Sequence, residues 1–559
     1  MRPRATGDRH ARRRRLWTFG LATALIAQGA CDAPPDGTES QPANLASSAG
    51  VPGLTAVEQQ RLTTYVDSLY ARSDVHHAFK TVFGEDIDCV DYLAQPAFKD
   101  PSIRALGLPS APSRPVGRAR APRRATRVST ISDGSLDENG NVRRCPDDTV
   151  PIVRVTPARI MRAGGLDRML AAGRKTFAPP PPGTSAPPAS AGYKYVLGVN
   201  QSVPAGSFGS DATHAIYNPP ITPGSNEHSL SQTWVLSPGT TVFGGCSSKA
   251  DCVQSLEAGW NVDAGLYGDT STHFFTFSTK DGYRNTGCYN LIANCGHTGS
   301  GFVLDPFAPF TPGQILPSST AGTANPFEIE LSWESGVDAS GNRNWYLYEN
   351  FSDLVGYIPA SLFSAGDGGA GAPLVSSYTL LQAGGEIYDS APGGHDTTAD
   401  MGSGQFASKG FWQAAYLRNI NYENSAATWT AATKLGSAFE SNSALYTGSM
   451  TAAAAATDWG TYFYYGGPGL TAPAAPKNVK AKASGGKVTI SWTSVTLADT
   501  YVVRRATKSG GPYTNVKTGI TTTSYKDGTV TRGKKYYYVV AAVNSVGTSA
   551  NSSQVSVTP

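Results

Sequence analysis

The chain has 559 residues, of which 61 are glycine and 38 proline, while only 16% are charged. This composition excludes a coiled coil, a helical bundle and a wholly disordered chain, and it favours short strands joined by many turns. The net charge of +4 hides an acidic block, residues 192–470 with 8 basic and 22 acidic side chains, between two basic ones, 101–175 and 471–559. The sequence is therefore a mosaic of several folded units.

The N-terminal residues have the pattern of an export signal. Seven arginines within residues 2–15 precede an apolar stretch over 16–30, which predicts a signal peptide at 1–30. Gly29-Ala30-Cys31 resembles a bacterial lipoprotein box, so Cys31 is a lipidation candidate; plain secretion is the alternative. We expect an exported protein, either a cell-surface lipoprotein or a secreted one.

Export makes the remaining six cysteines disulfide candidates. Short separations favour the pairs Cys246–Cys252 and Cys288–Cys295, which leaves Cys89 to pair with Cys145. Neither a C-x-x-C pair nor an H-E-x-x-H motif occurs, so we expect no metal site and no cofactor.

The upstream region contains a predicted helix between two unstructured segments. Residues 32–53 are a polar tether. Thr55 and Glu58 form a capping box, and apolar residues at helical spacing after it predict a helix over about 55–72. We expect residues 54–175 to be a small α/β or irregular prosegment, and 176–191 to be a proline-rich linker.

Residues 192–470 have the pattern of one large antiparallel β-sandwich. Alternating apolar stretches such as Phe327–Trp333 and Ala415–Ile420 are separated by Gly, Asn and Pro turns.

The last segment, 471–559, resembles a fibronectin type III domain. Trp492 has the position of the core tryptophan, and Tyr536 that of a tyrosine-corner residue. With 12 basic and 2 acidic residues, the segment predicts an anionic cell-surface polysaccharide as a partner. The alternative is a spacer whose lysines only aid solvation.

Carboxylates are the remaining candidates for chemistry. No G-x-S-x-G motif for a serine nucleophile occurs. The six cysteines are an even number, so disulfide pairing would leave no free thiol for a cysteine nucleophile. Glu257 and Glu386 are flanked by apolar and small residues, as on a sheet face with close backbone approach, although each could be an ordinary paired glutamate. Asp263, Asp269, Glu328 and Glu330 are expected to be solvated positions beside turns.

A set of motifs in fixed order resembles the neprosin family. The motifs are Ser231-Gln-Thr-Trp-Val235, Glu257-Ala-Gly-Trp260, Asp281-Gly-Tyr-Arg-Asn-Thr-Gly-Cys-Tyr-Asn290, Val355-Gly-Tyr-Ile-Pro-Ala-Ser-Leu-Phe363, Gly384-Gly-Glu386, His395-Asp-Thr-Thr-Ala-Asp-Met-Gly-Ser-Gly404 and Trp459-Gly-Thr-Tyr-Phe-Tyr-Tyr-Gly-Gly-Pro-Gly469. The stretches 87–98 and 145–152 resemble the family's activation peptide.

The resemblance implies a glutamic endopeptidase that cuts after proline in acid, with Glu257 and Glu386 as the catalytic pair. Trp260 and Tyr388, their neighbours, are candidates for the substrate cleft, although strand alternation would as readily point them into the core. Two adjacent carboxyls cannot both ionise cheaply, so one holds a proton while the other activates water, and an acidic optimum follows.

The charges also predict regulation. The basic segment 101–175 can dock on the acidic domain, so we expect an inhibitory prosegment that acid releases, with cleavage near Pro179–Pro188. A basic folding aid without inhibitory role is the alternative.

Two other function classes compete: a glycoside hydrolase with paired carboxylates in a sandwich cleft, and a surface carbohydrate-binding protein that lacks catalysis. Our expectation is a secreted, acid-active, monomeric endopeptidase with proline-rich peptide substrates and no nucleic-acid partner.

Overall fold

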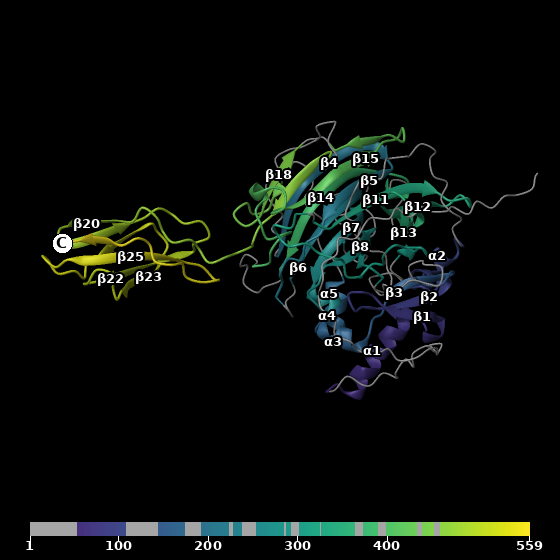
Figure 1. Cartoon of the computed structure of the whole chain (residues 1–559), viewed down its shortest axis with the longest axis horizontal. Coiled ribbons are helices and arrows are strands. Elements are labelled where there is room, and N and C mark those ends of the chain that lie inside the picture. Colours follow the sequence, from purple (N-terminus) through teal and green to yellow (C-terminus); the bar gives the residue numbers. More distant parts are fainter. Residues whose placement is uncertain are drawn as a thin grey trace, which may run out of the picture. The chain divides into compact units, whose positions relative to one another are not determined.

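The computed structural model of the chain (Figure 1) describes residues 53–107, 144–173, 192–222, 227–237, 253–283, 287–291, 301–324, 326–363, 373–389, 398–432, 439–451 and 459–559. The signal peptide, Cys31, the tether and the proline-rich linker lie outside the described residues. So do Cys246, Cys252 and Cys295, which leaves the pairs Cys246–Cys252 and Cys288–Cys295 as predictions.

Residues 54–175, which keep the name of the predicted prosegment below, begin with the predicted helix, α1 (Ala56–Leu69). The Thr55 hydroxyl accepts from the Glu58 amide, and the Glu58 carboxylate accepts in turn from the Thr55 amide at 3.0 Å, which completes the capping box. Leu62, Tyr65 and Leu69 are buried along one face. The helix prediction is confirmed, with an end at Leu69 and not at 72.

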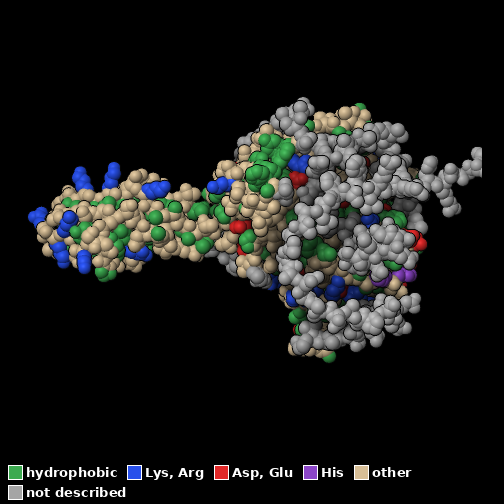
Figure 2. Space-filling model, in the orientation of Figure 1, with side chains coloured by type: hydrophobic (Ala, Val, Ile, Leu, Met, Phe, Trp, Pro, Cys, Tyr) green, Lys and Arg blue, Asp and Glu red, His purple; other side chains and the backbone are tan. Residues whose placement is uncertain are grey.

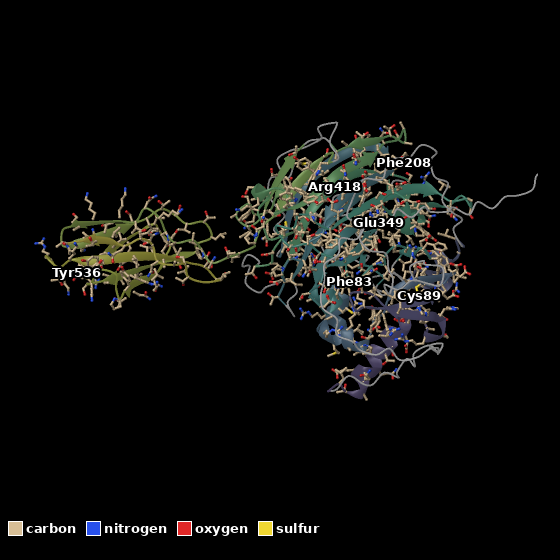
Figure 3. The ribbon with its side chains drawn as sticks, viewed as in Figure 1. Phe83, Cys89, Phe208, Glu349, Arg418 and Tyr536 are labelled. Atoms are coloured by element: carbon tan, nitrogen blue, oxygen red, sulfur yellow. A yellow bond between two sulfur atoms is a disulfide. The ribbon has the colours of Figure 1, made fainter. Side chains whose placement is uncertain are left out.

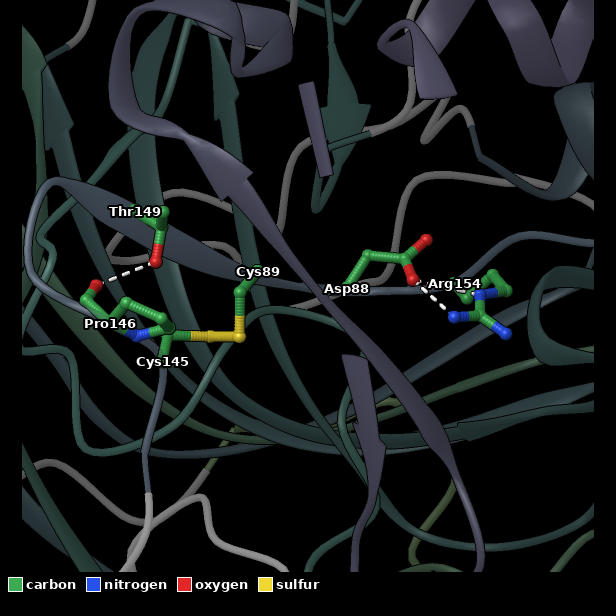
Figure 4. The surroundings of a disulfide bond; sticks show 6 residues. All are labelled: Asp88, Cys89, Cys145, Pro146, Thr149 and Arg154. Carbon is green, nitrogen blue, oxygen red and sulfur yellow. Dashed lines mark hydrogen bonds and ion pairs between the residues drawn. A yellow bond between two sulfur atoms is a disulfide. The ribbon is translucent and has the colours of Figure 1, made fainter. Parts of the chain in front are cut away.

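A small antiparallel sheet follows, in the order β1 (Val75–Lys80), β2 (Asp86–Asp91) and β3 (Thr149–Val153). The predicted disulfide Cys89–Cys145 is confirmed and ties β2 to the chain that enters β3 (Figure 4). On β2, buried Asp88 accepts hydrogen bonds from Arg154 and from Tyr70, the latter at 2.7 Å.

The helices are short apart from α1. In the described part of the chain, none is long and apolar enough to cross a membrane. The remaining α-helices are α2 (Pro101–Arg104), α3 (Pro157–Arg162), α4 (Leu166–Ala172) and α5 (Ala264–Tyr267). Single 3₁₀ turns occur at Arg72–Asp74, Tyr92–Ala94, Pro96–Lys99, Ala360–Phe363, Pro373–Val375 and Ala407–Lys409.

Two antiparallel sheets then form the predicted sandwich, and the mainly β fold class is confirmed. The nine-stranded sheet has the order β10-β13-β12-β11-β5-β15-β19-β18, with β16 beside β15. Its strands are β5 (Gly209–Ala215), β10 (Val303–Leu304), β11 (Glu328–Val337), β12 (Arg343–Glu349), β13 (Asp353–Pro359), β15 (Ala415–Glu423), β16 (Trp429–Ala431), β18 (Thr447–Thr451) and β19 (Tyr462–Gly466).

The seven-stranded sheet has the order β17-β4-β14-β6-β7-β8-β9. Its strands are β4 (Tyr193–Ser207), β6 (His228–Ser237), β7 (Gln254–Asp263), β8 (His273–Thr279), β9 (Cys288–Tyr289), β14 (Tyr378–Tyr388) and β17 (Phe439–Glu440). Strand alternation divides its side chains between the core of the sandwich and a second face that points away from the other sheet.

The prosegment packs directly on the sandwich and shares its hydrophobic core. The Gln95 side chain accepts from the Leu304 amide at 2.7 Å, and Glu85 accepts from the Ile315 amide at 2.8 Å. After α4, the carbonyl of Gly173 accepts from the Tyr289 amide on β9 at 3.2 Å. The prosegment therefore reaches the edge strand of the seven-stranded sheet.

The C-terminal unit is a separate sandwich with its own core. Its sheets have the orders β20-β21-β24 and β23-β22-β25-β26, the three-plus-four arrangement of a fibronectin type III domain. Trp492 is buried, and the Tyr536 hydroxyl accepts from the Thr531 amide at 3.0 Å, so both predicted roles are confirmed. The strands are β20 (Lys480–Ser484), β21 (Lys487–Ser491), β22 (Thr500–Ala506), β23 (Thr514–Ile520), β24 (Ser524–Asp527), β25 (Tyr536–Val543) and β26 (Val555–Val557).

Candidate active site

Glu257 and Glu386 lie on the same face of the seven-stranded sheet. Glu386 on β14 is paired with Leu230 of β6, and Glu257 on β7 is paired with Trp234 of the same strand. Because residues directly opposite one another project from the same face, and Leu230 and Trp234 are four residues apart, the two carboxylates share one face. We call it the glutamate face. Both glutamates are fully buried.

One row of paired residues lies between the two glutamates, and two of its positions are glycines. In this row Gln232 of β6 is paired with Gly384 of β14 on one side and with Gly259 of β7 on the other. A Cβ at Gly259 would lie 1.9 Å from the Ser231 carbonyl oxygen, and one at Gly384 would lie 2.0 Å from that of Val196. The Glu-Ala-Gly and Gly-Gly-Glu motifs thus need glycine because neighbouring backbone comes too close, as the sequence indicated.

Glu386 is held by two nitrogen-bearing side chains. Gln232 Nε2 donates to Oε2 at 3.1 Å, and His228 Nε2 lies 3.2 Å from Oε1. On its other side, His228 Nδ1 lies 3.7 Å from the carboxylate of Asp263. Burial raises the pKa of Asp263, and the nearby charge of His228 opposes that rise. His228 therefore bridges two buried carboxyl groups.

Glu257 is held by hydroxyl groups. The Tyr283 hydroxyl donates to Oε1 at 2.5 Å and the Ser255 hydroxyl donates to the same oxygen at 2.9 Å. The two hydroxyls also lie 3.1 Å from each other. The Tyr283 contact is short for a hydrogen bond between two oxygen atoms.

Three tyrosines are influenced by both carboxylates. Burial raises the pKa of Tyr195, Tyr283 and Tyr289 well above its usual value, and the negative charges of Glu257 and Glu386 raise each one further. Tyr195 is paired directly with Glu386, while Tyr289 is paired with Phe277, the partner of Glu257. The glutamate face is thus an electrostatically connected site whose phenols keep their protons.

The structure separates the two residues predicted to line the cleft. Tyr388 lies on the glutamate face, two residues after Glu386, with its ring centroid 4.6 Å from that of Tyr193 and 5.5 Å from that of His228. Trp260 lies on the opposite face, where its indole donates to the Ala215 carbonyl at 2.9 Å. The prediction for Trp260 is wrong because three residues from Glu257 is an odd step along a strand, which points the side chain into the core.

Three of the four other carboxylates expected to be solvated are buried. Arg418, labelled in Figure 3, forms a bidentate ion pair with Glu328 at 2.6 and 2.8 Å. Glu330 is also buried, two residues further along β11. Asp263 is buried against His228, while half-exposed Asp269 pairs with His273 at 2.9 Å. The acidic composition of this domain therefore reflects paired interior carboxylates as well as a solvated surface.

Sequence reasoning gave no role to His228, Gln232 or Tyr283. Gln232 and Tyr283 stand inside family motifs, and this was the signal available for them. His228 could be found only from strand register, which places it between Tyr388 and Asp263. In the described residues, no cluster of three or more His, Cys, Asp or Glu side chains has an arrangement that could hold a metal ion.

One protein-family model matches the part of the chain that contains this site. The model of the Neprosin family matches residues 225–468, which include both glutamates and every partner of theirs named above except Tyr195. Residues 225–468 form a neprosin domain. The match supports the function of a peptidase-type hydrolase for this domain. Its match does not extend to the prosegment or to the C-terminal sandwich.

Other similarities cover short parts of the chain. Two amylopullulanases are similar, from Thermoanaerobacterium saccharolyticum (38% identical over 91 residues, 16% of this chain) and Thermoanaerobacter thermohydrosulfuricus (40% over 94 residues, 17% of this chain). The chain spans only 7% and 6% of their respective lengths. A solved Fn3-like protein from Clostridium thermocellum is 43% identical, with coverage of 15% of this chain and 92% of that one and a TM-score of 0.15. The solved structure of FN3tt is 21% identical, with coverage of 16% and 96% and a TM-score of 0.15.

We predict that Gly259→Ala and Gly384→Ala each lower the free energy of unfolding by about 3 kcal/mol, the upper range for overpacking, because backbone must move away from the new methyl group. Gly336→Ala on β11 is the control, since its Cβ would approach only the Tyr346 ring, at 3.2 Å. Chemical denaturation followed by tryptophan fluorescence measures the three variants. Equal stability of all three would contradict this account of the motif glycines.

Proposed function

We propose that this protein is a secreted, acid-active endopeptidase that cleaves after proline with Glu257 and Glu386 as its catalytic acids. The observation that carries the proposal is the burial of both carboxyls on one face of a neprosin domain, each with its own hydrogen-bond donors. Export, with lipidation at Cys31, and a monomeric state belong to the same proposal and rest on the sequence.

The partners of the two glutamates assign them different roles. Both oxygens of Glu386 face nitrogen atoms, and the Gln232 amide can only donate through Nε2. A hydrogen bond donated by His228 Nε2 to Oε1 favours ionised Glu386 as well. The hydroxyls around Glu257 can donate or accept, so they tolerate a protonated carboxyl. Glu386 is therefore the base and Glu257 the acid.

Hydrolysis then follows from these protonation states. Glu386 removes a proton from a water molecule as the water oxygen forms a bond to the scissile carbonyl carbon. Glu257 gives its proton to the amide nitrogen, and the C–N bond breaks. The products are a carboxylic acid and an amine, and proton exchange with solvent restores the starting states. Acid is required because Glu257 must carry a proton at the outset.

The preference for proline is assigned to the aromatic end of the glutamate face. The rings of Tyr193 and Tyr388 pack against each other and against His228, next to Glu386, and Tyr388 is only half-buried. Rigid aromatic surfaces give an apolar ring a large contact area at low entropic cost. A pyrrolidine ring packed on these tyrosines would place the bond that follows it near Glu386.

Residues 54–175 act, in this proposal, as an inhibitory prosegment. Its last described residue, Gly173, is hydrogen-bonded to Tyr289, whose ring belongs to the glutamate face. Ala172 also packs against the apolar cluster that contains Tyr283 and Phe277. The prosegment therefore contacts the residues that surround Glu257.

The charges at this interface argue against release by acid alone. Burial raises the pKa of Glu85, so its protonation as the pH falls strengthens docking. Burial by itself would raise the pKa of Asp269 as well. The hydrogen bond and the charge of His273 outweigh that effect and hold the pKa of Asp269 at about 2. Its attraction to Arg159 of α3 is therefore lost only as the pH falls from about 4 toward 2. We propose instead that cleavage within 176–191 is the step that permits release.

The competing glycoside hydrolase and carbohydrate-binding functions are favoured by no feature of the glutamate face. Their test is a panel of neutral and acidic polysaccharides assayed beside a proline-containing quenched peptide from pH 2 to 8. Cleavage of a polysaccharide with no cleavage of the peptide would overturn the proposal.

Glu257→Gln and Glu386→Gln should each lower kcat on the peptide by about 10³-fold, since each removes a general acid or base. Glu334→Gln on β11 is the matched control and should keep its activity. Steady-state kinetics at pH 4 measures kcat for the three variants. A wild-type kcat in either Glu257→Gln or Glu386→Gln would refute the mechanism.

His228→Gln should lower kcat roughly 10- to 100-fold, the effect of one lost hydrogen bond to a charged group, with a smaller change in KM. The acid limb of the pH–activity profile should move to higher pH, because ionised Glu386 loses the hydrogen bond from the His228 ring. A fall in activity without any movement of that limb would indicate a merely structural role for His228.

Purified precursor incubated at pH 4 should lose its prosegment, and the Glu257→Gln/Glu386→Gln precursor should stay intact. N-terminal sequencing of the product is expected to place the cut within 176–191. Processing of the double variant at the wild-type rate would exclude self-cleavage. Full activity of uncleaved precursor would exclude inhibition.

A further inference from the structure

One sheet of the C-terminal domain carries a cationic face. Lys480 and Lys482 on β20, Lys487 on β21 and Lys526 on β24 are all exposed. Pairing places Lys482 opposite Thr489, and Thr489 opposite Lys526, while Lys487 is paired with Ser484. These residues therefore project from one side of the three-stranded sheet. We call the four lysines the lysine face.

Acidic residues are absent from this face. Residues 471–559 contain only two, Asp499 and Asp527. Asp527 is buried and accepts from Arg505 and Tyr538, each at 2.7 Å, and Asp499 directly precedes β22 in the other sheet. Within the described residues none of the four lysines forms an ion pair. Their charges are thus uncompensated, and Figure 2 shows Lys and Arg side chains around this domain.

The remaining side chains of the face are small and polar. Ser484, Thr489, Ser491 and Ser524 stand between the lysines, and neither an aromatic nor a large aliphatic side chain projects from these strands on this side. A nucleic acid would find no ring on which a base could stack, and a membrane would find no apolar group to insert. The face offers only ammonium groups and hydroxyls.

We propose that the lysine face binds an anionic polysaccharide, one that carries carboxylate or sulfate groups along its chain. Lys480 and Lys482 are about 7 Å apart along β20, and Lys482 and Lys526 are about 10 Å apart across two strand spacings. Flexible, strongly hydrated ammonium groups at such intervals suit repeated anionic groups on an extended chain, and hydroxyls between them suit sugar hydroxyls. This inference does not depend on the peptidase activity of the neprosin domain.

The test uses the full chain and a charge-matched control. One variant carries Lys→Gln at 480, 482, 487 and 526, and the control carries Lys→Gln at 508, 517, 534 and 535, which are exposed lysines outside this face. Binding to immobilised polygalacturonate is measured by surface plasmon resonance between 20 and about 300 mM salt, a range over which surface charges become screened. We expect at least a tenfold weaker Kd for the first variant and less than a threefold change for the control.

Comparison surfaces decide the class of partner. Neutral dextran, single-stranded DNA and phosphatidylglycerol vesicles are measured in parallel, and thermal unfolding verifies that both variants fold like the wild type. Equal weakening by the two variants would overturn the proposal in favour of net charge alone. No binding to polygalacturonate, or face-dependent binding that is tighter to DNA or to vesicles, would overturn it as well.

Discussion

The arrangement of the site depends on one strand. β6 is paired with β14 on one side and with β7 on the other, so its register fixes the positions of Glu386 and Glu257 relative to each other. A slip of one residue in either pairing would move a glutamate into the core of the sandwich. Gly259 lets the backbone of β6 approach β7 closely, and Gly384 does the same between β4 and β14, so both positions opposite Gln232 lack side chains.

Burial of two carboxyls is costly unless hydrogen bonds compensate the lost hydration. Here the compensation is distributed unequally. Glu386 has nitrogen-bearing partners and a histidine that contacts a second carboxyl group, whereas Glu257 has hydroxyl partners. The same contacts that make burial tolerable also distinguish the two acids chemically, which is what an acid–base pair requires.

The prosegment is integrated into the sandwich and not merely tethered to it. It shares the main hydrophobic core and places the end of α4 beside the edge of the glutamate face. The segment that covers apolar surface of the sandwich therefore also contacts the residues that surround Glu257. The C-terminal domain, by contrast, has a hydrophobic core of its own and a net charge of the opposite sign.

The sequence by itself determined the β-rich class, helix α1, the Cys89–Cys145 pair and the fibronectin-like domain, and it identified Glu257 and Glu386 as candidates. These features depend on local pattern, on residue counts or on ordered motifs. Only the tertiary structure decided that Trp260 faces the core, that Asp263 is buried and that His228 contacts Glu386. The reason is physical: cross-strand register joins residues such as His228 and Glu386, 158 positions apart, and neither spacing nor composition encodes that pairing.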